Sequence, residues 1–323
     1  ASELTDGDKG VVLDWAGLDL RALGRLLEAT QPIQAGLEFL VKQKDWKRAV
    51  ANAGNLSELY LTLGEVGQAV ASAHQSVDFA DRSGDGFQRE SKRTTLADAL
   101  HQSGVLAEVH QLFREAEAMQ QQRQPEYSYL YSLQGFRFCD LLLSQGQYQE
   151  VQKRARQTLE WVTKQYWLLD IALDKLSLGR AFLLQALAET TDPSLRANAF
   201  NQARDYLQQA VAGLREAGTQ DHLPRGLLAR AACYRTQNEF ALASADLEEA
   251  REIAERGEMN LHLADYHLEA CRLLLAESMA HGAEGKREKA KEHVETAEEM
   301  IEKMGYGRRK PEVEELRKEL EKL

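Results

Sequence analysis

The chain has 323 residues and a formal net charge of −11, with 51 acidic against 40 basic side chains and only 5 prolines. This balance excludes nucleic acid as a main partner, because phosphate binding needs a clustered basic face, and the one dense basic run, at 308–310, is interleaved with glutamates. No signal peptide or long apolar span is present, so we expect a cytoplasmic protein without a membrane partner.

The three cysteines indicate a reducing compartment. Cys139, Cys233 and Cys271 lie far apart in helical runs, without a CxxC partner or the spacing of metal ligands. We therefore expect them to be small buried side chains.

The N-terminal part predicts a short flexible start and a first hairpin. Residues 1–10 are polar and carry two glycines, so we expect them to be flexible. Residues 11–29 have a helical apolar period and predict one helix. Pro32 fits the first turn of a second helix, where its missing N–H is tolerated, and this helix ends at Gln43. Asp45 then caps a helix that opens with Trp46.

The stretch 55–80 predicts the helical hairpin that the rest of the chain repeats. Leu56, Tyr60 and Gly64 follow one another at intervals of four, and Ala69 and Ala73 come after them. A hairpin of this size cannot bury its apolar face alone, so copies must stack, and each copy is expected to contact only its neighbours.

The same register returns along nearly the whole chain. The turns after the first helices fall at Gly64, Gly104, Gly146 and Asn238, which are the residue types that best adopt a left-handed conformation. The packing seam of the second helices begins with small or short residues. The eighteen seam positions are Ala69, Val109, Val151, Ala203, Ala243 and Ala290, then Ala73, Phe113, Ala155, Leu207, Leu247 and Val294, and then Ser76, Ala116, Thr158, Ala210, Ala250 and Ala297.

Loop-like segments interrupt this register in two hairpins. Residues 189–194 and 278–285 predict longer turns, and residues 83–86, 124–125, 218–224 and 256–257 predict connectors between repeats. A turn at 305–307 precedes a final helix at 312–323 that carries Val313, Leu316 and Leu320 on one side. We therefore divide the chain into a flexible start (1–10), a repeat array (11–305) and a capping helix (306–323).

The repeated register resembles the tetratricopeptide repeat family. The residues that carry the resemblance are Leu56, Ser57, Tyr60, Gly64, Ala69, Ala73 and Ser76, and later Ala231, Tyr234, Asn238, Phe240, Ala243, Leu247 and Ala250. Over residues 18–305 this implies an all-α fold: a right-handed TPR-like α-solenoid of six to seven hairpins with a C-terminal capping helix. A period above 40 also suits armadillo or HEAT repeats, but the glycine between the paired helices favours the tetratricopeptide type.

A narrower resemblance points to the C-terminal repeat arrays of bacterial signalling NTPases of the STAND class. It rests on the segments 20–26, 45–46, 55–59, 223–230, 261–270 and 305–309. In that class the array follows an NB-ARC or NACHT ATPase module and senses the ligand. No GxxxxGK[ST] motif occurs in this sequence, so the resemblance implies that the ATPase module lies elsewhere in the same longer chain.

A protein or peptide in the concave groove is the expected ligand of such an array. The resemblance places the first helices along this groove, and the residues expected to line it are Glu58, Thr62, Asp98, His101, Tyr127, Tyr131, Arg137, Asp140, Arg180, Arg225, Arg235 and His267. The four arginines form a basic stripe suited to an acidic ligand, unless they pair with neighbouring acids such as Asp140. The two tyrosines are either core aromatics or part of a recognition surface.

The chaperone-tail clamp of tetratricopeptide co-chaperones is not expected. That clamp needs Lys and Asn where this chain has Gly54, Glu58, Thr94 and Asp98.

We expect no metal, cofactor or catalytic residue. In the run 262–267, His262 and His267 are five residues apart, whereas a zinc helix needs two histidines at i and i+4. The leading hypothesis is therefore the ligand-sensing array of a bacterial STAND-type signalling or defence protein. The alternative is a free-standing adaptor that scaffolds a complex, and an enzyme is a third, unsupported class.

Overall fold

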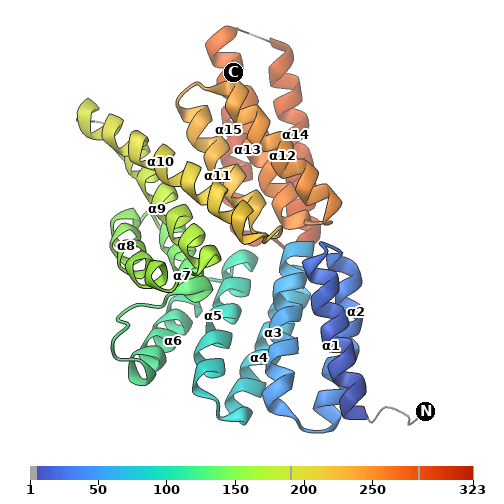
Figure 1. The fold of residues 1–323 in the computed structure, drawn as a ribbon. Coiled ribbons are helices and arrows are strands. Elements are labelled where there is room, and N and C mark those ends of the chain that lie inside the picture. The colour runs from blue at the N-terminus through green and yellow to red at the C-terminus, as the bar shows by residue number, and fades with distance from the viewer. Residues whose placement is uncertain (1–5, 190, 283, 323) are drawn as a thin grey trace. The chain divides into compact units, whose positions relative to one another are not determined.

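The computed structural model describes residues 6–189, 191–282 and 284–322, and all regular structure in these residues is helical (Figure 1). The helices are α1 (Asp6–Ala22), α2 (Leu26–Lys42), α3 (Trp46–Leu63), α4 (Val66–Ser83), α5 (Gly86–Ser103), α6 (Val109–Arg123), α7 (Ser132–Ser144), α8 (Tyr148–Lys164), α9 (Leu168–Ala188), α10 (Pro193–Ala217), α11 (Leu223–Thr236), α12 (Phe240–Arg256), α13 (Asn260–His281), α14 (Glu284–Met304) and α15 (Lys310–Glu321). Consecutive helices pair into hairpins, and α15 follows the last pair. The all-α architecture of packed helical hairpins predicted from the sequence is confirmed for the described residues.

The predicted turns and seams are confirmed in detail. Gly64 has φ 86° and Asn238 has φ 61°, so the chain reverses through left-handed residues where the sequence predicted it. Gly64 is also packed closely, since a Cβ there would lie 2.3 Å from the sulfur of Met304. All eighteen seam positions are at most 3% exposed. Small residues at these positions therefore let the paired helices approach closely.

The first hairpin differs from its prediction. The helix expected over 11–29 is interrupted, because α1 ends at Ala22 and the chain turns at Gly24, with φ 75°. Pro32 lies inside α2 rather than in its first turn, so one backbone hydrogen bond, to the Glu28 carbonyl, is missing. The apolar period continues across the turn, and periodicity alone therefore could not locate it.

The chain ends and the long turns show smaller differences. Residues 1–5 of the expected flexible start lie outside the described residues, and α1 already begins at Asp6. The loop expected at 278–285 is shorter, because α13 continues to His281 and α14 begins at Glu284. The loop at 189–194 is confirmed in position: α9 ends at Ala188, and Asp192 caps α10.

The chain divides into two compact units. The first takes in the chain up to Ser128 together with the short segments 256–261 and 302–308, and the second comprises 129–255, 262–301 and 309–323. Within the first unit, the Asn260 side-chain amide donates to the Leu63 carbonyl oxygen at 2.9 Å. Gly307 lies so close to the Ser103 carbonyl that a Cβ would be 2.2 Å from its oxygen. The expectation that each repeat contacts only its neighbours is therefore wrong for this unit.

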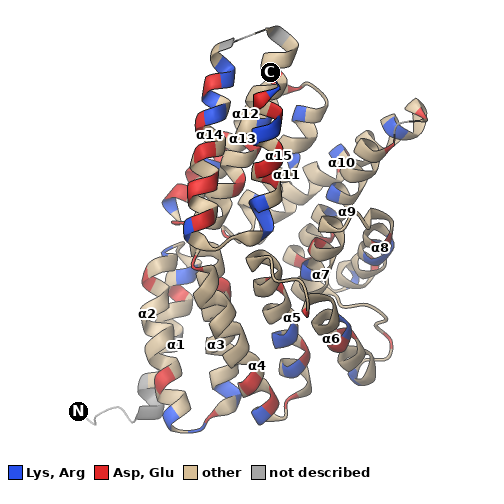
Figure 2. Ribbon diagram, turned by 180° about the vertical axis from the view of Figure 1, so that it is seen from behind, with Lys and Arg blue, Asp and Glu red and all other residues tan. Residues whose placement is uncertain are grey.

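Charged residues of both signs are interspersed along the helices of both units (Figure 2). No helix in the described ranges is both long and apolar enough to span a bilayer.

Candidate protein-binding site

The first helices of the hairpins in the second unit form one layer. Helix α9 packs directly on α7 and on α11, while α8 and α10 pack against α9 from the second-helix side. Several side chains link neighbouring first helices to one another. We call the surface that carries them the first-helix face, defined by Tyr131, Phe136, Asp140, Trp167, Arg180 and Arg225.

One end of the first-helix face is aromatic. Tyr131 and Trp167 immediately precede α7 and α9, and their rings stack with centroids 6.2 Å apart and an interplanar angle of 21°. Trp167 is 43% exposed, and its neighbours Tyr166 and Leu168 are 84% and 43% exposed. Three consecutive bulky apolar residues are thus open to solvent at one turn, which is typical of an interaction surface.

The first-helix face also carries charged side chains. The Arg180 guanidinium lies 2.7 Å from a carboxylate oxygen of the buried Asp140, and the Arg180 side chain keeps 26% of its surface exposed. The guanidinium of Arg225, on α11, lies 5.9 Å from the ring centroid of Phe136, on α7. Two of the predicted groove arginines therefore contact other first helices, and the Arg180–Asp140 pair is the internal pairing that the sequence left open.

Towards the C-terminus, Arg235 belongs to a chain of ion pairs. It lies 2.6 Å from Glu269, which is 3.6 Å from Arg272, and Arg272 in turn is 2.5 Å from Glu312 of α15. Arg309 also pairs with Glu312, and it contacts Asp265 at 2.8 Å. Burial alone would raise the pKa of Glu312, but the charges of Arg309 and Arg272 outweigh it and hold the pKa at about 2. These pairs join α15 to α13.

The polar side chains of residues 262–267 do not meet at one site. The fully buried His262 bonds through Nε2 to the Asp221 carbonyl at 3.2 Å, and burial, with the nearby charge of Arg225, lowers its pKa to about 4. Asp265 faces Arg309, while His267 faces His293 of α14 with their Nδ1 atoms 2.8 Å apart. The residues of this run thus serve three separate contacts.

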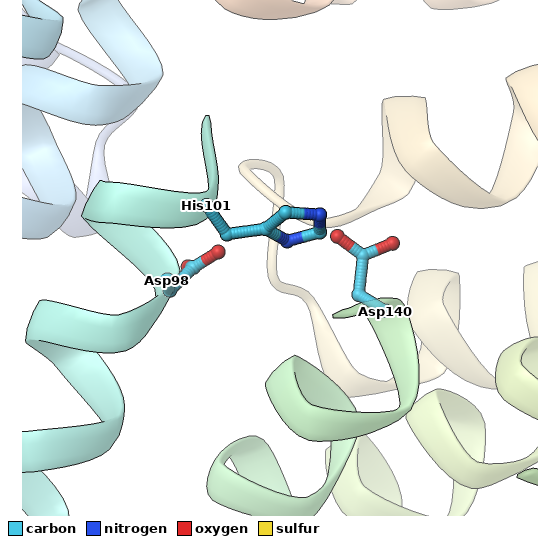
Figure 3. A group of neighbouring side chains, drawn as sticks. All are labelled: Asp98, His101 and Asp140. Atoms are coloured by element: carbon cyan, nitrogen blue, oxygen red, sulfur yellow. The ribbon is translucent and has the colours of Figure 1, made fainter. Parts of the chain in front are cut away.

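The groove residues predicted in the first unit occupy more enclosed positions. Glu58 is paired with Arg21 at 3.2 Å. Asp98 and His101 extend from the end of α5 (Figure 3) and are 6% and 1% exposed. Asp98 accepts a hydrogen bond at 2.9 Å from Gln102, whose own side-chain oxygen accepts one from Arg308 at 3.0 Å. These polar side chains are therefore part of the packed interior.

The remaining residues that were predicted to line the groove are partly or fully buried. Tyr127 and Tyr131 are partly exposed, whereas Arg137 and Asp140, both on α7, are 5% and 4% exposed. Their role in ligand binding stays a prediction.

Sequence reasoning missed the exposed residues at the turn before α9. Tyr166 occupies a left-handed position, with φ 56°, where Gly or Asn is usual. A bulky aromatic residue at such a position was a usable signal. The partners Glu269 and Glu312 could not be found from sequence, because they lie 34 and 40 residues from the arginines that they bind.

No protein-family model matches the sequence, and no curated protein matches it. Among solved structures, the chain is similar to that in "Crystal Structure of Rap Protein Complexed with Competence and Sporulation Factor", at 12% identity and a TM-score of 0.44. The match covers 99% of this chain and 78% of that chain. The function of this chain is therefore inferred from its own residues and contacts.

Proposed function

We propose that this chain is a non-catalytic protein-binding scaffold that holds an extended peptide segment on the first-helix face of the second unit. The observation that carries the proposal is the exposed group of three bulky residues, Tyr166, Trp167 and Leu168, in which Trp167 stacks on Tyr131. The seam positions already supply the packing between helices, so the fold does not require these exposed rings. Exposed Trp and Tyr are the residue types that dominate binding energy at protein interfaces.

The arginines of the first-helix face suit an acidic residue in the ligand. The pair with Asp140 engages Nη2 of Arg180, and a guanidinium has five N–H donors in all. A ligand carboxylate can therefore bind Arg180 while the pair with Asp140 stays intact. The same arrangement positions the guanidinium before the ligand arrives, which lowers the entropy lost on binding.

The three cysteines are poorly suited to nucleophilic catalysis. Burial raises the pKa of Cys139 and Cys271 to about 12 and that of Cys233 to about 11. Thiols with such pKa values stay protonated at neutral pH and are poor nucleophiles.

The proposal is tested by selecting a phage-displayed random peptide library on the full chain. Recovered peptides are expected to be rich in Asp and Glu and to bind Trp167→Ser and Arg180→Gln at least about tenfold more weakly than the unsubstituted chain. Ser at position 167 is a good N-cap for α9, and Gln at position 180 can still donate to Asp140, so both variants keep the fold. The matched control is Leu195→Ser on α10, where the side chain is also exposed, at 53%.

Peptides that bind both variants as tightly as the unsubstituted chain would contradict the proposal. So would peptides whose binding is reduced equally by the Leu195 control.

The finer proposal is that this scaffold is the ligand-sensing array of a cytoplasmic bacterial STAND-type protein, in which ligand binding biases the switch of an ATPase module. Its support is the sequence resemblance alone. A nucleotide-binding motif encoded upstream in the same reading frame supports it, whereas a start codon directly before this chain favours the free-standing adaptor.

A further inference from the structure

The last hairpin of the second unit brings two imidazoles together. His267 lies on α13 and His293 on α14, and their Nδ1 atoms are 2.8 Å apart. The ring centroids are 5.0 Å apart, and the ring of Tyr266 meets both histidines edge-on, at 5.0 and 5.8 Å. Both histidines are only partly buried, so the pair can be reached from solvent.

The pair holds one shared proton between two basic nitrogens. At 2.8 Å one Nδ1 must carry a hydrogen and the other must accept it, so one lone pair already points at the neighbouring ring. Burial and the partner imidazole lower the pKa of His267 to about 4, and burial also lowers the pKa of His293. Neutral imidazole nitrogens are common metal ligands, so two of them this close together offer a pair of donor atoms.

Charged side chains of both signs lie near the pair. Arg251 of α12 faces His267, but its guanidinium is paired with both Glu248 and Glu255. Glu292 adds a further negative charge beside His293. The two carboxylates that pair with Arg251 thus offset the charge of the guanidinium that faces His267.

We propose that His267 and His293 form a two-imidazole binding site for a divalent transition-metal ion, with copper(II) or nickel(II) favoured over zinc. With metal–nitrogen bonds of about 2.1 Å, two nitrogens 2.8 Å apart subtend an angle of about 85° at the metal. That angle fits adjacent positions of a square-planar or tetragonal site. A tetrahedral zinc site would need the nitrogens about 3.3 Å apart.

The bound ion takes the place of the shared hydrogen bond. The ring that carries the Nδ1 hydrogen changes to its Nε2–H tautomer through solvent exchange, so both Nδ1 lone pairs face the metal and no net proton is released. Water fills the remaining coordination positions. The ion would bridge α13 and α14 and so fix the last hairpin. The proposal is independent of the peptide site, whose residues lie on α7, α9 and α11.

Electron paramagnetic resonance of the untagged full chain during copper(II) titration tests the proposal. We expect one ion per chain with hyperfine coupling to two equivalent nitrogens. His267→Gln and His293→Gln should each remove one coupled nitrogen and weaken binding by about tenfold or more. His74→Gln, at an exposed position on α4, is the matched control and should leave the spectrum unchanged. Zinc should compete more weakly than nickel.

Copper coupled to fewer than two nitrogens in the unsubstituted chain would overturn the proposal, and this readout does not depend on the variants folding. Binding that is unchanged in both histidine variants, or lost in the His74 control, would also overturn it.

Discussion

Helices α5 and α9 are both first helices of their hairpins, and both bury many of their own side chains. The two helices differ in the kind of side chain that they bury. The buried residues of α5 include Glu90, Thr94, Thr95, Asp98, His101 and Gln102, whereas the only polar residues buried on α9 are Asp174 and Ser177. The burial of α9 is therefore stabilised mainly by the hydrophobic effect, which has no directional requirement and is roughly proportional to the apolar area removed from water. Burial of α5 depends on particular partners, because a buried polar group without one is costly.

This difference predicts which kind of substitution destabilises each helix. Helix α9 should be sensitive to lost volume, and α5 to lost hydrogen-bond partners. The predictions below test this contrast, from the largest expected effect to the smallest.

Leu176→Ala should be the most damaging change in α9. Leu176 is fully buried, so the substitution removes apolar contacts and leaves a cavity, at a cost of about 2–5 kcal/mol in the free energy of unfolding. Urea unfolding followed by circular dichroism measures this loss. Leu187→Ala on the same helix, where the side chain is 46% exposed, should change stability by less than about 0.5 kcal/mol. Equal losses in the two variants would show that α9 does not depend on core volume.

Arg123→Ala should be the corresponding test for α5. Arg123 binds the buried Glu90 through two hydrogen bonds, of 2.6 and 3.2 Å, and Glu90 is 1% exposed. Removing the guanidinium leaves a buried carboxylate without its counter-charge, and we expect a loss of about 2–3 kcal/mol, since the Arg123 side chain itself is one-third exposed. Adding Glu90→Gln should recover part of this loss in a double-mutant cycle. No recovery would mean that the charge of Glu90 is not the cause.

Asp174→Asn, on α9, should change how the stability of the chain depends on pH. Asp174 accepts a hydrogen bond from Thr158 at 2.9 Å, and burial raises its pKa well above the usual value, with a further contribution from Asp170. The folded state therefore holds a proton that the unfolded state loses, so stability falls as the pH rises above about 4, the usual aspartate pKa. Thermal unfolding between pH 4 and pH 8 should show this decline in the unsubstituted chain and a flatter profile in the variant. Parallel profiles would contradict an elevated pKa.

The smallest expected effect concerns the connectors that precede the two helices. The connector before α5 has Gly84, with φ 71°, and the connector before α9 has Tyr166, with φ 56°. Tyr166→Asn should raise stability by about 0.5–1 kcal/mol, because asparagine tolerates the left-handed region better than tyrosine. A thermal melt measures the gain, and a loss would show that the exposed ring contributes to folding as well as to the proposed peptide site.

Much of the fold could be predicted because local chemistry determined it. The turn at Gly64, the cap at Asp45, which accepts from the Arg48 amide, and the small seam residues all follow from short-range rules. The interruption at Gly24 was missed because apolar residues continue in phase on both sides of it. The burial of Asp98 and His101 was missed because polar residues on a helix indicate a solvated face unless their distant partners are known.

The candidate site was only partly predictable for the same reason. Arg180 and Arg225 were identified from their places in the repeat register, and Tyr131 from its place one helical turn after Tyr127. The contacts that define these residues come from other helices. The register gives the direction of a side chain on its own helix. It does not give the partner on the next helix, such as Glu269 for Arg235.

The inclusion of residues 256–261 and 302–308 in the first compact unit has a consequence for protein synthesis. The hydrogen bond from Asn260 to Leu63 joins groups 197 residues apart. At ribosomal rates of about 5–20 residues per second, the Leu63 carbonyl emerges about 10–40 s before its partner exists. The first hairpins are therefore exposed, without this contact, throughout that interval. A chaperone that binds nascent chains would therefore have longer to bind these hairpins than hairpins whose contacts are all local.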